Sequence, residues 1–164
     1  FFLYHEDVDL SLRVRLAGGR LGVAEAARAD HAYEFDKGGE KWRYLERNRW
    51  ATVIRTYPAA LLVLVMPALI ATDVALWPVA LAGGWGRQRL LALADTLQSL
   101  PRLLAERRRI QATRAISAGA FAAALSPDLD STFLGAASKS RTLRSLLRAY
   151  WRAVTALLRS NPRR

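Results

Sequence analysis

The sequence predicts a mostly α-helical protein with a small β element. Apolar residues recur every three or four positions beside arginines in 87–110 and 139–160, the pattern of amphipathic helices. Between them and the N-terminal third lies an apolar run, 56–85, whose single charged residue is Asp73. Two short stretches, 20–24 and about 28–33, have the length of edge strands. With 164 residues, 52% of them hydrophobic, the chain can bury one modest core.

Residues 8–16 fit two patterns. Apolar and polar side chains alternate strictly there, which is typical of a half-buried strand. We nevertheless predict a helix over 6–17, because acidic residues fill its first turn, Arg13 and Arg15 come late, and two glycines follow. Val8, Leu12 and Leu16 also satisfy the helical spacing.

A second helix is predicted to begin at Gly39 or Glu40, after a turn-rich segment. It carries a run of basic residues that includes Lys41, Arg47 and Arg49. Such a run forms a solvated face in many helices. Guanidinium groups also match phosphate oxygens, so the same residues are candidates for contact with a diphosphate.

The apolar run 56–85 is long enough to cross a bilayer, which needs about 20 residues. Three prolines interrupt it, Asp73 lies near its middle, and both flanks are basic. These features favour a re-entrant or shallow hairpin that bends near 67–73 over a plain span, and a buried core helix remains an alternative. The helix predicted over 139–160 has an apolar face with arginine shoulders, which suits either anionic lipid or packing on the rest of the domain.

The net charge of +11, from 25 basic and 14 acidic residues, favours an anionic partner. The arginines lie beside long apolar faces and no nucleic-acid motif is present, so we expect anionic membrane lipid and no nucleic acid. The chain has no cysteine, which excludes disulfides and thiolate metal sites.

The densest chemistry is at the N-terminus, where three carboxylates, Glu6, Asp7 and Asp9, follow an apolar run. Acidic residues at a helix start commonly cap the helix and interact with its dipole. An acidic pair at the end of a strand also lies where α/β proteins place their sites. Both interpretations apply to this cluster.

The pattern Phe-Phe-Leu-Tyr-x-Glu-Asp-Val-Asp-Leu-x-x-Arg-x-x-x-x-Gly, which ends at Gly18, resembles the acceptor-side motif of family-2 glycosyltransferases. These are inverting enzymes with a GT-A domain, and the likeness is to rhamnosyltransferase-like members. It continues through residues 29–31 and 41–49. The resemblance implies that Asp7 is the catalytic base, that Glu6 and Asp9 orient the base or the acceptor, and that Arg13 offsets their charge.

The resemblance also implies that His31 helps to hold a divalent metal, Mg or Mn. Imidazole can complete such a shell, although oxygen ligands are what these ions prefer. The candidate substrate-binding residues are Arg13, Lys41, Arg47, Asn48 and Arg49. The implied substrates are a nucleotide-diphosphate sugar and a glycan or lipid-linked acceptor.

Together these patterns predict the C-terminal fragment of a GT-A α/β domain followed by hydrophobic and amphipathic helices. Residues 1–55 would be the acceptor-side remnant, 56–85 a membrane-embedded segment, and 86–164 a basic tail. We expect such a fragment to be inactive alone and the intact enzyme to act at the cytoplasmic face of the bacterial inner (plasma) membrane. The alternative is a non-catalytic, basic amphipathic module for membrane binding or scaffolding.

Overall fold

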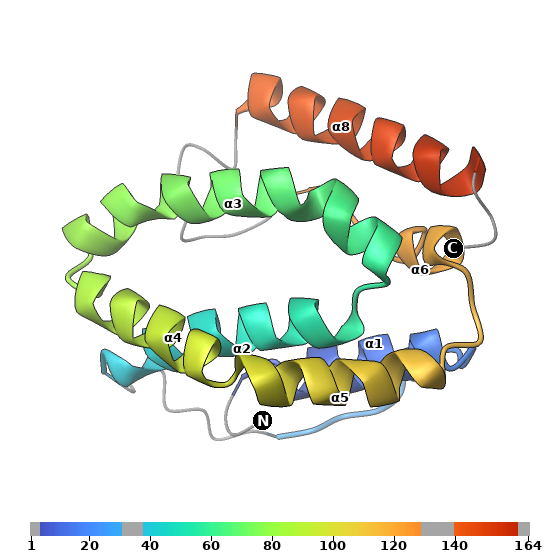
Figure 1. The fold of residues 1–164 in the computed structure, drawn as a ribbon, viewed down its shortest axis with the longest axis horizontal. Helices are drawn as coiled ribbons and strands as arrows, with labels where there is room; N and C mark the ends of the chain where they lie inside the picture. The colour runs from blue at the N-terminus through green and yellow to red at the C-terminus, as the bar shows by residue number, and fades with distance from the viewer. Residues whose placement is uncertain (1–3, 31–37, 129–139, 161–164) are drawn as a thin grey trace.

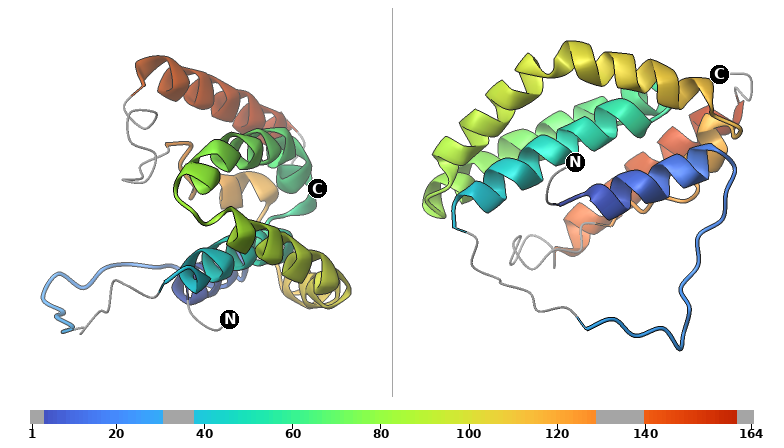
Figure 2. Two further views of the ribbon diagram at one scale, coloured as in Figure 1. Left: turned by 90° about the vertical axis from the view of Figure 1, so that its left-hand side faces the viewer. Right: turned by 90° about the horizontal axis from the view of Figure 1, so that it is seen from below.

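The computed structural model describes residues 4–30, 38–128 and 140–160. Its elements are α1 (Glu6–Leu16), α2 (Glu40–Thr56), α3 (Ala59–Ala82), α4 (Gly86–Gln98), α5 (Leu100–Ala112), α6 (Ala118–Ala122) and α8 (Arg141–Ser160). Helix α2 packs on α1, α4 and α5, while α3 packs on α6 and α8. The chain therefore forms two groups of helices, which lie one above the other in Figures 1 and 2.

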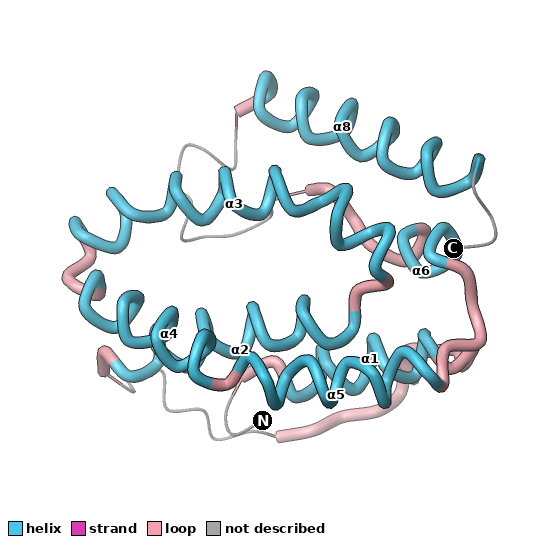
Figure 3. The backbone as a smooth tube through the Cα atoms, viewed as in Figure 1, coloured by secondary structure: helices cyan, strands magenta, loops and turns pink. Residues whose placement is uncertain are grey.

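The prediction of a GT-A α/β fragment is wrong, because the described residues contain helices and loops and no strand (Figure 3). Residues 20–24, predicted as a strand, form an exposed loop in which Val23 is 98% accessible. A strand needs a neighbour for its backbone hydrogen bonds, and no described segment supplies one. Residues 28–30 of the second predicted strand are also loop, and 31–33 lie outside the described residues. The mostly helical part of the prediction agrees with the structure.

Helix α1 confirms the helical interpretation of the N-terminal segment. Leu12 and Leu16, one turn apart, face the core, whereas Val8 and Leu10 are exposed. Alternate residues therefore do not share a face, as they would in a strand. Gly18, with φ +82°, follows the helix in the left-handed conformation that favours glycine.

The core lies where α1, α3, α6 and α8 meet. Leu16, Leu61, Phe121 and Leu158 are buried there, and Tyr57 contacts the Phe121 ring edge-on at 5.8 Å between centroids. The helix predicted over 139–160 is observed as α8, and its Tyr150 hydroxyl donates a hydrogen bond to the carbonyl of Leu64 in α3. One face of α8 therefore packs on the rest of the chain, which is one of the two interpretations that the sequence allowed for this helix.

Two helical segments differ from the sequence prediction. Helix α3 continues from Ala59 to Ala82 through Pro67 and Pro78 and does not turn back near 67–73. The single helix predicted over 87–110 is divided into α4 and α5, which meet at Ser99. Pro101 lies in the first turn of α5, where its missing N–H would have no intrahelical partner, so it begins a helix rather than bending one.

Candidate functional site

The acidic end of α1 begins at a strained turn. Tyr4 and His5 both adopt positive φ, 66° and 65°, which residues with a Cβ rarely do. Glu6 and Asp7 then form the exposed first turn of the helix, and the Asp7 Oδ1 atom accepts a hydrogen bond from the Val8 amide at 2.8 Å. Backbone strain of this kind is concentrated at functional sites, where surrounding contacts sustain it.

Helix α2 holds that turn in place. The buried side chain of Asn48 donates through Nδ2 to the Tyr4 carbonyl at 3.0 Å, and its Oδ1 accepts from Arg47 Nε at 3.0 Å. The predicted substrate-binding residue Asn48 is therefore in direct contact with Tyr4 of the N-terminal motif, although 44 positions separate them. Burial and the positive charge of Arg49 lower the pKa of His5, which keeps its imidazole neutral at pH 7.

Asp9 has a different environment from Asp7. It is 5% exposed and lies 3.4 Å from Arg55 and 3.7 Å from Arg13. Arg55 also pairs with Glu106 of α5 at 2.9 Å, so Asp9 belongs to a chain of charges that joins α1, α2 and α5. These contacts position α1, whereas the Asp7 carboxylate is exposed to solvent.

A polar cleft of about 420 Å³ lies beside these residues, between α2 and the junction of α4 and α5. Arg47 and Asn48 line it together with Arg55 and Arg102, so its wall is rich in guanidinium groups. Two of the predicted substrate-binding residues therefore face one cavity of a size that suits a phosphate-bearing group.

The remaining predicted residues lie elsewhere. Lys41 is in the first turn of α2, with its Nζ atom 6.0 Å from the centre of the Trp42 ring. Arg49 is bonded to Glu46 and Asp73. His31 lies outside the described residues. The described residues contain no group of three histidine or acidic side chains that could hold a metal ion.

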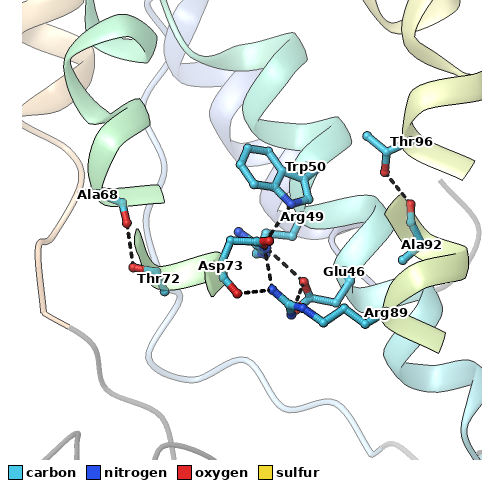
Figure 4. A network of polar contacts seen from close by, with 9 residues as sticks. All are labelled: Glu46, Arg49, Trp50, Ala68, Thr72, Asp73, Arg89, Ala92 and Thr96. Atoms are coloured by element: carbon cyan, nitrogen blue, oxygen red, sulfur yellow. Dashed lines mark hydrogen bonds and ion pairs between the residues drawn. The ribbon is translucent and has the colours of Figure 1, made fainter. Parts of the chain in front are cut away.

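A network that the sequence analysis missed joins α2, α3 and α4 (Figure 4). Arg89, 3% exposed, donates to Glu46 Oε2 at 2.9 Å and to the Asp73 carbonyl at 2.7 Å. Arg49 reaches Asp73 Oδ1 at 2.6 Å, and the Trp50 indole reaches the same atom at 3.2 Å. Asp73 is thus neutralised by two arginines. A carboxylate that is the single charged residue of an apolar run requires cationic partners when the run packs. The position of Asp73 in the sequence was therefore the signal that could have predicted this network.

By length and composition, α3 alone among the described helices could cross a membrane. Its most apolar stretch has a mean hydropathy of 2.3, and 11% of that stretch is buried within the protein. Val63, Ile70, Val74 and Leu81 are all more than half exposed, and their spacing puts them on one face of the helix.

No protein family, curated protein or solved structure matches this chain. The described residues form a basic helical protein with an exposed acidic helix start, a guanidinium-lined cleft and an exposed apolar helix face.

Proposed function

We propose that this chain supplies the acceptor-side carboxylate of a membrane-associated, inverting sugar transferase. The donor would be a nucleotide-diphosphate sugar, and the acceptor a glycan or a lipid-linked hydroxyl at the cytoplasmic face of the bacterial plasma membrane. The observation that carries the proposal is the contrast between two neighbouring carboxylates. Asp9 is buried in ion pairs, whereas Asp7 is exposed directly after a strained turn.

In the proposed reaction, the acceptor hydroxyl attacks the anomeric carbon from the face opposite the diphosphate. The bond from the acceptor oxygen to that carbon forms as the bond to the phosphate oxygen breaks. Asp7 takes the hydroxyl proton, and the nucleoside diphosphate leaves with the bonding electrons. Asn48 contributes indirectly, since its bond to the Tyr4 carbonyl fixes the turn that presents Glu6 and Asp7.

Arg47 is the best-placed cation for a phosphate, because it lines the polar cleft and has a neutral partner in Asn48. Arg49 is bonded to two carboxylates and serves the helix network instead. The described residues hold no nucleotide-binding sheet, so the proposal covers the acceptor side of the reaction. A divalent metal stays a prediction from the resemblance, and no step is assigned to it.

Sugar transfer is tested with membranes from cells that express the natural protein carrying these residues. Labelled nucleotide-diphosphate sugars are supplied with Mg²⁺, and incorporation into lipid-extractable and polymeric product is measured. We expect label to enter product with release of nucleoside diphosphate and to stop when EDTA removes the metal. A matched membrane lacking the protein is the control, and equal incorporation in both preparations would refute the proposal.

The second candidate function is membrane binding without chemistry, and the exposed face of α3 favours it. Since Arg49 and Arg89 neutralise Asp73, that carboxylate no longer opposes contact with lipid. Helix α3 also packs on α6 and α8. We therefore propose that it lies along the membrane surface, with Val63, Ile70, Val74 and Leu81 in the lipid.

Changing Ile70 and Val74 together to asparagine should weaken binding to anionic vesicles by about tenfold or more, since each buried apolar side chain contributes about 1.5 to 3 kcal/mol. Flotation with vesicles measures this partition. The matched control changes Leu21 and Val23, two exposed apolar residues of the loop after α1. Equal losses in the two variants would contradict a lipid contact through α3.

A further inference from the structure

A second cavity is lined by residues that belong neither to the acidic site nor to the polar cleft. This open groove, of about 850 Å³, is lined by the first turns of α3, the second half of α5, Arg114 just after α5, and the last turns of α8. Its walls are of two kinds. Val63, Leu64 and Leu157 make an apolar side, and Arg107, Arg108 and Arg114 make a cationic side. We call it the Arg107 groove.

The three arginines of the groove have no acidic partner among the described residues, in contrast to several arginines elsewhere in the protein. Arg43, Arg49, Arg55 and Arg89 each lie within 4.0 Å of a carboxylate. Among the described residues, no carboxylate comes within that distance of Arg107, Arg108 or Arg114. The groove therefore gathers positive charge that nothing described neutralises.

Arg107 shows how crowded this charge is. Its Nη1 atom donates at 2.5 Å to the carbonyl of Ile54, in the last turn of α2, and at 2.7 Å to the carbonyl of Tyr57, which follows that helix. These carbonyls carry no net charge. Burial and the positive charge of Arg114 lower the pKa of Arg107. A bound anion would relieve that repulsion, and Arg108 and Arg114 are the guanidinium groups left to contact it directly.

The apolar side of the groove indicates what the uncharged part of the ligand is. Val63 is 72% exposed, and it belongs both to the groove and to the lipid-facing side of α3. Leu157, which α8 contributes to the same apolar side, is 56% exposed. An inorganic anion would leave these side chains in water. An anion with a hydrocarbon tail would cover them, and the tail could continue along α3 toward Ile70.

We propose that the Arg107 groove binds one anionic phospholipid, with the phosphate against Arg108 and Arg114 and an acyl chain along Val63 and Leu157. This inference rests on the membrane association of the proposed function. It adds a defined lipid site, on residues separate from Asp7 and the polar cleft.

The test uses the full chain in mild detergent, with phosphatidylglycerol or phosphatidylcholine added and the bound lipid counted by native mass spectrometry. We expect one phosphatidylglycerol to be retained and phosphatidylcholine to be lost. The double variant Arg108→Gln/Arg114→Gln should weaken that retention by roughly 25-fold, the product of about fivefold for each arginine near a lipid headgroup. The matched control is Arg87→Gln/Arg109→Gln, which removes the same charge from exposed positions of α4 and α5.

A tail contact is tested by Val63→Asn against Val74→Asn, an exposed position of α3 outside the groove. Only the first should lower the number of retained lipids. Equal loss of lipid in the groove and control doubles, or displacement of the lipid by millimolar inorganic phosphate, would overturn the proposal. Failure of the wild-type chain to float with vesicles would instead refute membrane association, because lipid retention in detergent is measured independently of it.

Discussion

Replacing Asp7 with asparagine should lower the rate of sugar transfer by about 10²-fold to 10⁴-fold, the usual contribution of a general base. The substitution preserves the shape of the side chain and its ability to accept the bond from the Val8 amide, but it removes proton affinity. Donor binding should change little, because Asp7 is assigned to the acceptor hydroxyl. The measurement is kcat and the KM for the donor in membranes that contain the natural protein.

The neighbouring change, Asp9→Asn, is the control for that prediction. Asp9 is buried against Arg55 and Arg13, so its loss leaves a buried guanidinium with weaker partners and should lower the melting temperature. Asp7→Asn should leave the melting temperature unchanged because its side chain is exposed. Near-normal turnover of the Asp7 variant would remove this residue from the mechanism. A large loss of stability would show instead that its role is structural.

Replacing Arg89 with methionine should lower the free energy of unfolding by about 3 to 5 kcal/mol, the cost of removing one partner from a buried ion network. Methionine keeps most of the apolar volume of the side chain. The change nevertheless leaves Glu46 without the bond from α4, and it leaves Asp73 with Arg49 and the neutral Trp50 indole as partners. Arg89 also lies over the rings of Trp77 and Trp85, at 5.3 and 5.9 Å from their centres, and those contacts are lost as well.

Denaturant unfolding followed by circular dichroism measures this loss. Arg87→Met is the control, since Arg87 is exposed two positions earlier on the same helix. The effect of Arg89→Met should shrink in an Asp73→Leu background, where less negative charge is left unpaired. A loss that is the same in both backgrounds would show that Arg89 stabilises the fold through its apolar contacts instead.

The helices were predictable where a local signal was strong. The acidic first turn and following glycines marked α1, and the arginine-flanked apolar face marked α8. The strand predicted at 20–24 is wrong because a short segment of that length forms an edge strand only when another strand lies beside it, and no described segment does. Helix α3 continues past Pro67 because a proline removes one hydrogen bond without requiring the chain to reverse.

The residues of the candidate site were proposed from the sequence, whereas their contacts with one another were not. Glu6, Asp7, Arg47 and Asn48 were identified from sequence, but the bond from Asn48 to the Tyr4 carbonyl depends on how α1 and α2 pack. The same holds for Arg55 and Arg89, whose partners lie far along the chain. The sequence alone does not show which of the 25 basic residues form ion pairs with a carboxylate, because that depends on how the helices pack.

The exposed segment 17–30 after α1 runs away from the helices (Figure 2). A protease that cuts after Arg20 or Arg28 would therefore break the backbone without releasing what precedes the cut. The Ala115 amide holds the Leu16 carbonyl at 2.7 Å, Arg55 holds Asp9, and Asn48 holds Tyr4. After the cut, the acidic helix α1 would be a separate peptide, no longer joined to the other helices through the backbone. It would stay bound to them through these contacts, so the nicked protein would persist as a peptide–protein complex.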